Sequence, residues 1–224
     1  MRAVSVLILL LSLTTGLLAQ LSEEEIPQSL RYILHLDLEK WEEPEELTKN
    51  LVYYLSGFDF ENRPVWVVEF GKWDLRSILE RGEIWDKLFD KYVDKFLWRL
   101  WKSLPIKATP EKPVKECVVI FDMEGYDLQQ MNSPAALGFI IKKLRTVTAA
   151  IPITSGAYII NANFLAKNLL NLLRPVLGKE FSRVEIYGAN SKSYRRVLLR
   201  NIPQNQLPES YGGSKGSKPV QIYG

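Results

Sequence analysis

The chain has 224 residues, of which 46% are hydrophobic and 25% are charged, a balance typical of globular proteins. This composition excludes wholesale disorder, a collagen-like chain and a membrane protein with many spans. The formal net charge of +3 is too small to indicate a nucleic-acid-binding protein. The single cysteine, Cys117, excludes an intramolecular disulfide framework, and the single histidine, His35, argues against a histidine metal site or a Ser-His-Asp triad.

The charged residues are distributed unevenly along the chain. Residues 23–46 hold nine acidic and two basic side chains, whereas residues 140–224 hold 13 basic and three acidic ones. A basic C-terminal half is consistent with phosphate groups or an anionic membrane as a partner, and equally with an ordinary solvated surface.

Residues 1–19 differ from the rest of the chain. Arg2 is the only charged residue among them, and residues 4–13 are almost continuously apolar. A basic start, a short apolar run and a small-residue end predict a secretory signal peptide, cleaved near Gly16 or Ala19. An uncleaved anchor is the alternative, although the apolar run falls short of the ~20 residues that span a bilayer. We therefore expect a secreted, extracellular protein.

The first half of the chain predicts two strands and one long helix. Residues 20–50 form a short acidic segment in which prolines separate expected short helices and turns. Two runs of β-forming residues follow, at 51–55 and 65–70, with a turn at 62–64 between them. Residues 83–103 give the strongest helix signal, because pairs of apolar side chains recur every four residues with charged side chains in the gaps. We expect this helix to cover a sheet.

The second half alternates between strands and helices. An apolar run without alternation at 117–121 is typical of a strand buried on both faces of a parallel sheet. Ser133-Pro134 predicts the start of a helix that runs to about Ala150. Further elements are expected as a strand at 157–160, a helix at 164–177, a strand at 184–187 and a helix at about 193–199. The pattern predicts an α/β fold, a mainly parallel sheet of about five strands flanked by helices, followed by a flexible tail at 214–224.

Motifs for catalysis and nucleotide binding are missing from the sequence. It has no P-loop, no GxGxxG after a strand and no GxSxG elbow. Asp122 and Glu124 follow the strand at 117–121, where open α/β sheets place their sites, so they are a candidate carboxylate pair. The alternative, which we favour, is that they organise the tight turn at Gly125. We expect no enzymatic activity, no cofactor and no metal ion.

The helix at 164–177 has two interpretations. Apolar side chains occupy much of its circumference, whereas Lys167, Asn168, Asn171 and Arg174 make a narrower polar face. It is either one more helix that covers the sheet or a movable lid over an apolar pocket. Its amphipathic pattern is compatible with both.

Four stretches of the sequence resemble the CRAL-TRIO lipid-binding domain family, which includes phosphatidylinositol, tocopherol and retinaldehyde carriers. Residues 56–65 (SGFDFENRPV) resemble its GxDxxGRPV segment, and residues 118–125 (VVIFDMEG) resemble an apolar strand followed by DxxG. Residues 158–162 (YIINA) resemble its IINAP strand end, and residues 207–213 (LPESYGG) match its LPxxxGG ending. The motifs occur in the order and spacing of the family and assign residues 51–213 to a CRAL-TRIO-like domain.

The resemblance implies a carrier of a lipid or other small hydrophobic molecule, with the helix at 164–177 as a lid over the ligand. The expected pocket wall consists of Phe139, Ile140, Tyr158, Ile160, Phe164, Leu165, Leu169, Leu172, Leu173 and Val176. In phosphatidylinositol-binding members, an acid after a proline and a lysine before the last strand contact the headgroup. Here Ile153 follows Pro152, and Arg183 stands at the lysine position, so the cation is kept and the acid is missing.

We therefore predict a secreted, non-enzymatic, monomeric protein that binds and transfers a hydrophobic ligand. Exchange would take place at a transiently bound membrane surface. Four basic residues with no acid among them are candidates for contacting an anionic bilayer: Lys192, Arg195, Arg196 and Arg200. The alternative for these residues is a solvated helix face. A second function class also stays open, that of a protein-interaction module that keeps the fold without a ligand and presents residues 23–46 to its partner.

Overall fold

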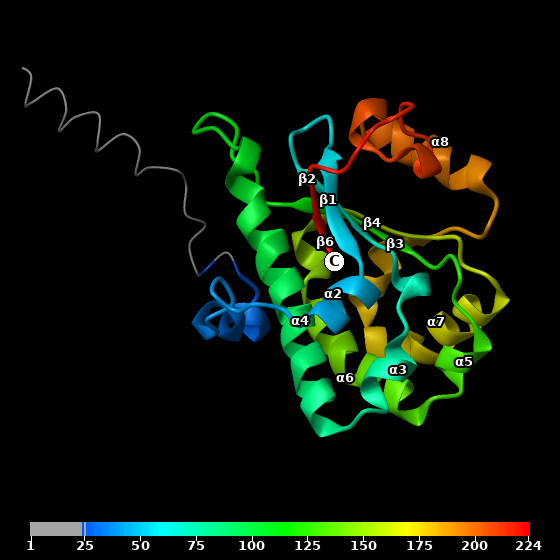
Figure 1. Cartoon of the computed structure of the whole chain (residues 1–224). Coiled ribbons are helices and arrows are strands. Elements are labelled where there is room, and N and C mark those ends of the chain that lie inside the picture. Colours follow the sequence, from blue (N-terminus) through cyan, green and yellow to red (C-terminus); the bar gives the residue numbers. More distant parts are fainter. Residues whose placement is uncertain (1–23, 25) are drawn as a thin grey trace, which may run out of the picture.

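The computed structural model of the chain describes residue 24 and residues 26–224 (Figure 1). The signal peptide expected at residues 1–19 lies outside the described residues. Within the part of the chain that the structure describes, no helix combines the length and the apolar character needed to cross a membrane.

A six-stranded sheet forms the centre of the molecule, with the strand order β5-β4-β3-β2-β1-β6. Its strands are β1 (Tyr53–Phe58), β2 (Pro64–Val68), β3 (Cys117–Asp122), β4 (Thr154–Ile160), β5 (Val184–Ile186) and β6 (Gln221–Tyr223). Strands β2 to β5 run parallel to one another, whereas β1 pairs antiparallel with both β2 and β6. The mainly parallel α/β sheet expected from the sequence is confirmed, with six strands in place of about five.

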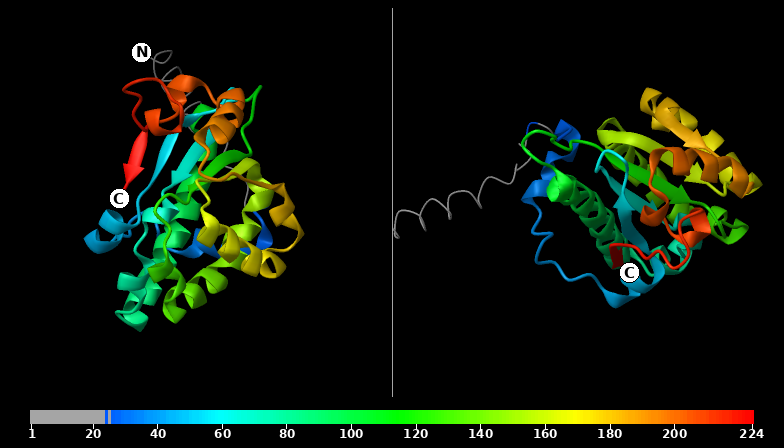
Figure 2. Two further views of the ribbon diagram at one scale, coloured as in Figure 1. Left: turned by 90° about the vertical axis from the view of Figure 1, so that its right-hand side faces the viewer. Right: turned by 90° about the horizontal axis from the view of Figure 1, so that it is seen from above.

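The additional strand comes from the segment 214–224, for which we expected a flexible tail. Tyr53 of β1 pairs with Tyr223 of β6. The Tyr223 ring stacks on Tyr53 and on Trp66 at centroid distances of 5.5 and 5.8 Å. Figure 2 shows this strand lying along the edge of the sheet. Aromatic packing and backbone pairing therefore order the end of this segment.

Helices cover both faces of the sheet (Figures 1 and 2). On one face lie α4 (Glu83–Ser103), α6 (Pro134–Ala149) and α7 (Phe164–Leu177), and on the other lies α8 (Ser191–Asn201). The shorter helices are η2 (Gln28–His35), α2 (Glu45–Asn50), η3 (Phe70–Lys72), α3 (Leu75–Leu79), η4 (Leu104–Lys107), α5 (Leu128–Met131), η5 (Ile151–Ile153), η6 (Lys179–Arg183), η7 (Gln204–Gln206) and η8 (Glu209–Tyr211).

The two faces of the sheet have separate cores, because successive residues of a strand point to opposite faces. Val119 and Ile159 pack on the side of α4, α6 and α7. Ile120 and Tyr158 pack on the other side, together with Leu198 of α8. This alternation decides which strand residues can contact a ligand on the α7 side.

Capping side chains set the start of α6 and α7. The Ser133 hydroxyl accepts the backbone N–H of Ala136 at 3.3 Å, and Pro134 occupies the first turn of α6. The Asn163 side chain accepts the backbone N–H of Ala166 at 2.9 Å and donates to the carbonyl of Tyr126 at 2.7 Å. Asn163 therefore begins α7 and ties it to the loop after β3.

Asp122 ends β3 inside the protein, with 2% of its surface exposed. Its carboxyl group accepts the backbone N–H of Glu124 at 2.9 Å, the side-chain amide of Asn161 at 2.8 Å and the hydroxyl of Tyr211 at 2.7 Å. The Glu124 side chain is exposed. These contacts favour the turn interpretation of Asp122 and Glu124 over a catalytic carboxylate pair.

Candidate functional site

A cavity of about 200 Å³ lies between the sheet and the layer of α4, α6 and α7. One water molecule needs about 10–15 Å³ of such space, so the cavity has room for a sizeable part of an organic ligand. Sheet residues form its floor, among them Val119, Ala157 and Ile159. Helix residues form its walls: Phe89, Val93, Phe96, Leu97 and Leu100 from α4; Phe139, Ile140, Leu144 and Val147 from α6; Leu169, Leu170, Leu173 and Leu177 from α7.

Four of the ten residues expected in the pocket wall line this cavity, namely Phe139, Ile140, Leu169 and Leu173. Phe139 stacks on Phe89 of α4 at a centroid distance of 4.3 Å and so joins two helices at the cavity wall. Leu169 and Leu173 lie one turn apart on the inner face of α7 and are 2% and 4% exposed. The structure therefore places α7 over an apolar cavity, as the lid interpretation requires.

The structure corrects the expected positions of the other wall residues. Tyr158 and Ile160 pack on the opposite face of the sheet, where the Tyr158 hydroxyl accepts the side-chain amide of Asn201 at 3.0 Å. Phe164 and Leu172 lie on the outer face of α7, with 75% and 65% of their surface exposed. Of the remaining two, Leu165 is half-buried against the α7 core, and the side chain of Val176 lies outside the described parts.

Helix α4 contributes to the cavity wall, which was not predicted from the sequence. Five of its side chains line the cavity, although we expected this helix only to cover the sheet. The available signal was the width of its apolar stripe, which includes Val93, Phe96, Leu97 and Leu100 on adjoining positions of the helix surface. An apolar stripe of this width lets some side chains of α4 pack on the sheet while others line the cavity.

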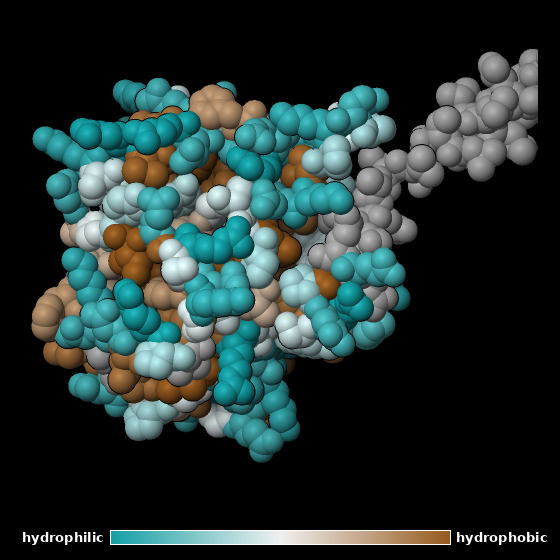
Figure 3. Space-filling model, turned by 180° about the vertical axis from the view of Figure 1, so that it is seen from behind, coloured by the Kyte–Doolittle hydropathy of each residue, from teal (hydrophilic) through white to brown (hydrophobic). Residues whose placement is uncertain are grey.

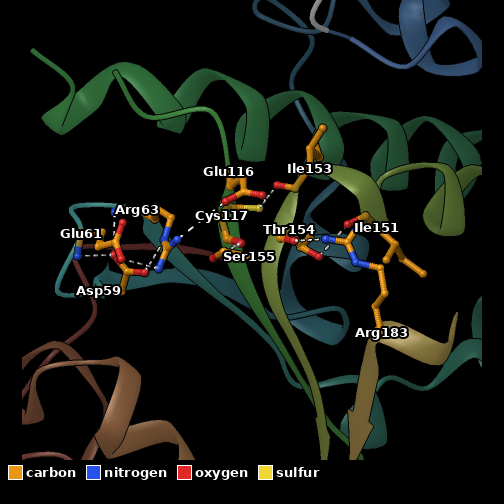
Figure 4. Close-up of polar contacts among 10 residues, drawn as sticks. All are labelled: Asp59, Glu61, Arg63, Glu116, Cys117, Ile151, Ile153, Thr154, Ser155 and Arg183. Atoms are coloured by element: carbon orange, nitrogen blue, oxygen red, sulfur yellow. Dashed lines mark hydrogen bonds and ion pairs between the residues drawn. The ribbon is translucent and has the colours of Figure 1, made fainter. Parts of the chain in front are cut away.

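Arg183, the expected headgroup cation, is not among the residues that line the cavity, and Figure 4 shows it beside Thr154 of β4. Its guanidinium donates to the backbone carbonyl of Thr154 at 3.3 Å and lies 3.9 Å from the carboxylate of Glu180. Thr154 and Phe181 line the cavity, whereas the Arg183 side chain is 47% exposed. Arg183 therefore stands at the outer end of the wall, in contact with solvent.

The other groups drawn in Figure 4 support the fold. The Arg63 guanidinium lies 2.6 Å from Asp59, 3.6 Å from Glu61 and 3.7 Å from Glu116, which holds the turn between β1 and β2 against the start of β3. Burial raises the pKa of the Cys117 thiol, with a smaller contribution from Glu116, so this thiol stays protonated. Arg63 thus has a structural role in the fold, and so does the buried Cys117.

The basic residues of α8 divide into two kinds. Lys192, Arg196 and Arg200 are exposed. Arg195 is half-buried, and its guanidinium donates to the backbone carbonyl of Ser210 at 2.8 Å. Three of the four expected membrane-contact residues are therefore free to meet an outside partner, and the fourth holds the loop around η8.

The β1–β2 turn, the end of β3, the end of β4 and the loop around η8 carry the four motifs noted in the sequence, and they surround one sheet. A family model described as the CRAL/TRIO domain matches residues 48–213, about three quarters of the chain. The chain belongs to the CRAL/TRIO domain family. The matched residues include β1 to β5, α4, α6 and α7, so the floor and the walls of the cavity are parts of the CRAL/TRIO domain.

Two curated relatives are similar in sequence to the chain, and one solved structure is similar in fold. The chain is 26% identical over 187 residues to the phosphatidylinositol/phosphatidylcholine transfer protein SFH4 of Arabidopsis thaliana, a match that covers 79% of this chain and 29% of that protein. It is 24% identical over 179 residues to the Sec14 cytosolic factor of Schizosaccharomyces pombe, covering 78% and 60%. The chain thus spans less than two thirds of these relatives. The crystal structure of Sfh5 matches with a TM-score of 0.57 at 12% identity, over 85% of this chain and 64% of that chain, a likeness of fold.

Proposed function

We propose that this CRAL/TRIO domain binds a lipid or another small hydrophobic molecule in the cavity beneath α7 and transfers it without catalysis. The observation that carries the proposal is the cavity, about 200 Å³ of space with an almost wholly apolar wall. Protein interiors keep few voids larger than a water molecule, and an empty apolar void of this size destabilises a domain by several kcal/mol. A ligand that fills the cavity removes this penalty. The name of SFH4, a phosphatidylinositol/phosphatidylcholine transfer protein, supports a lipid as the ligand.

The apolar wall sets the scale of the affinity. Each CH₂ group of an acyl chain that leaves water contributes ~0.8 kcal/mol. About ten such groups therefore contribute ~8 kcal/mol, which corresponds to micromolar binding before the cost of ordering the chain is subtracted. Such binding is strong enough to extract a ligand and weak enough to release it.

We propose α7 as the element that opens and closes the cavity. Its inner face covers the cavity with Leu169 and Leu173, while Phe164 and Leu172 are exposed on its outer face. Figure 3 shows apolar side chains gathered on this side of the molecule. Exposed apolar side chains over a lipid-sized cavity suit contact with a bilayer, where opening of α7 lets a ligand pass without crossing water.

The basic residues of α8 provide a second contact with the same surface. Helices α7 and α8 cover opposite faces of the sheet, and both lie at the right-hand end of the molecule in Figure 1. A bilayer at this end would meet the exposed Phe164 and Leu172 of α7 together with the exposed cations of α8, Lys192, Arg196 and Arg200. Each such cation contributes ~1 kcal/mol at an anionic surface.

We further propose that the protein is exported and acts as a monomer. Export rests on the pattern of residues 1–19 alone, which is that of a signal peptide. Detection of the protein in the medium of a secreting eukaryotic host, with its new N-terminus near residue 17 or 20, would support export. Retention inside the cell would contradict it.

The proposal is tested by mass spectrometry of the protein purified from such a host, first in the native state and then after organic extraction. A lipid in a 1:1 ratio with the protein is the expected result. The variant Leu169→Asp puts a carboxylate on the cavity wall and should abolish the bound lipid, whereas Asn171→Asp, which puts a carboxylate on the exposed side of the same helix, should keep it.

Circular dichroism shows whether both variants fold. Lipid retained by a folded Leu169→Asp variant would overturn the placement of the ligand under α7. A fully packed interior is expected of the alternative function, a protein-interaction module without a ligand, so the cavity favours the carrier.

A further inference from the structure

Among the described residues that line the cavity, Lys143 of α6 is the one with a formal charge. Its ammonium group lies 2.7 Å from a carboxylate oxygen of Asp90 and 2.8 Å from one of Asp94, both on α4. The side chains of Lys143 and Asp94 are 8% and 7% exposed, so this ion pair is shielded from solvent. One cation at the wall is thus matched by two anions.

The neighbouring charges do not reverse this balance. Lys142 lies 3.2 Å from Asp86 and 3.6 Å from Asp90, so two lysines share three aspartates. The hydroxyl of Tyr32 donates to Asp94 at 2.9 Å. Burial and then this hydrogen bond raise the pKa of Tyr32, which keeps its hydroxyl a donor. The group of charges between α4 and α6 therefore carries a net negative charge.

Two threonines complete the polar part of the wall, and both use their hydroxyl protons within the protein. Thr148 donates to the backbone carbonyl of Leu144 at 2.8 Å, and Thr154 donates to that of Ile151 at 2.8 Å. Their oxygen lone pairs stay available, so each can accept a hydrogen bond from a ligand. The wall thus offers acceptors to a ligand.

We infer that the cavity selects uncharged lipids, whose polar group is at most a hydroxyl, over lipids that would bring an anionic group against Lys143. The inference rests on the proposed function, since it concerns the ligand of the same cavity. A hydroxyl that reaches the wall finds an acceptor in one of the two threonines. An anionic group finds its one cation already engaged by two carboxylates, and it loses its hydration without compensation.

A pair of ligands that share a chain and differ in charge tests the inference. Dodecanol and dodecanoate are titrated into the protein at pH 8, and each dissociation constant is obtained from displacement of a fluorescent fatty-alcohol probe. Dodecanol is expected to bind at least about 10-fold more tightly. Equal or tighter binding of dodecanoate would overturn the inference, whereas failure of both ligands to bind would refute lipid binding itself.

Variants locate the source of the preference. Asp94→Asn leaves one aspartate beside Lys143, and the double variant Asp90→Asn/Asp94→Asn leaves none, so the preference for dodecanol should fall several-fold in steps. Glu83→Gln is the matched control, because Glu83 lies on the same helix but pairs with Lys87 at the surface, where both side chains are more than two thirds exposed. An unchanged ratio in a folded Asp94→Asn variant would overturn the role of the aspartates. The ratio of two affinities in one variant is insensitive to its loss of stability.

Discussion

The hydroxyl of Tyr211 donates a hydrogen bond of 2.7 Å to the carboxyl group of Asp122, which lies 89 residues earlier in the chain. Asp122 ends β3, and Tyr211 lies in η8 within the LPESYGG motif. Both residues are buried, with 2% and 3% of their surface exposed. The contact therefore fastens the loop around η8 to the sheet, on the face opposite the cavity.

The first prediction concerns this contact. Tyr211→Phe removes the hydroxyl and leaves a buried carboxyl group with one donor fewer, so it should lower the free energy of unfolding by about 2 kcal/mol. Tyr187→Phe is the control, because its hydroxyl bonds to an exposed carboxylate, that of Glu185. Urea denaturation measures both variants. If both substitutions lowered the free energy of unfolding equally, the buried hydrogen bond from Tyr211 to Asp122 would contribute no special stability.

The second prediction concerns the unfilled volume of the cavity. Ala157 of β4 lines the cavity, and Ala157→Leu places three further carbon atoms in it, so thermal stability should hold or rise while ligand uptake falls. Ala166 of α7 is fully buried outside the cavity wall, and Ala166→Leu should cost about 2 kcal/mol through overpacking. Scanning calorimetry and the lipid content after purification give the two readouts. If both variants were destabilised to a similar extent, the space beside Ala157 would be filled by protein atoms and not by a cavity.

The third prediction concerns pH. Glu43 lies 2.8 Å from Lys95 and 2.5 Å from Arg99, each with less than a sixth of its side chain exposed. Burial alone would raise the pKa of Glu43, but the two cations outweigh it and lower the pKa below its ordinary value of 4.5. Ionised Glu43 thus stabilises the fold above its unfolded-state pKa, and this contribution is lost as the pH falls through the lower folded-state pKa.

Wild type should therefore lose stability between pH 6 and pH 3 more steeply than Glu43→Gln, which should be less stable than wild type at pH 7. Glu45→Gln is the control, because Glu45 pairs with Lys49 on the surface, where both side chains are more than two thirds exposed. Urea midpoints across this pH range make the comparison. Parallel pH profiles of wild type and Glu43→Gln would rule out a contribution from this ion pair.

The fourth prediction concerns the bilayer contact of α8. Replacing the exposed Lys192, Arg196 and Arg200 by glutamine should weaken binding to vesicles that contain anionic lipid by about 100-fold, at ~1 kcal/mol per charge. Binding to neutral vesicles should change little. Sedimentation with vesicles at two salt concentrations measures the effect, since the electrostatic part weakens as salt is added. Unchanged binding of the triple variant would identify these residues as a solvated helix face.

The elements of the fold were predictable because their signals are local. The paired apolar residues between 83 and 103 predicted α4 with its full range, and Ser133-Pro134 predicted the start of α6. The continuous apolar run at 117–121 predicted β3 as an inner strand of a parallel sheet. β6 escaped prediction because a three-residue strand has little propensity of its own, and Tyr223 is ordered by Tyr53 and Trp66, which lie far away in the sequence.

The cavity was predictable only in part. Leu169 and Leu173 followed from the helical period of α7, and Phe139 and Ile140 from the helix before β4. Tyr158 and Ile160 did not, because alternation shows that neighbours on a strand face opposite ways without showing which face has the cavity. The local pattern likewise gave no reason to place Lys143 beside two aspartates of another helix.

The amino-acid sequence by itself determined the α/β class, the order of the elements and the resemblance to one family, because these depend on periods and motifs within short stretches. The tertiary structure alone decided which face of the sheet is hollow, which side of α7 points inward and which charges are neutralised at the wall. These properties arise where α4, α6 and β4 meet. They depend on distances between residues that the chain separates by dozens of positions, and no local pattern encodes such distances.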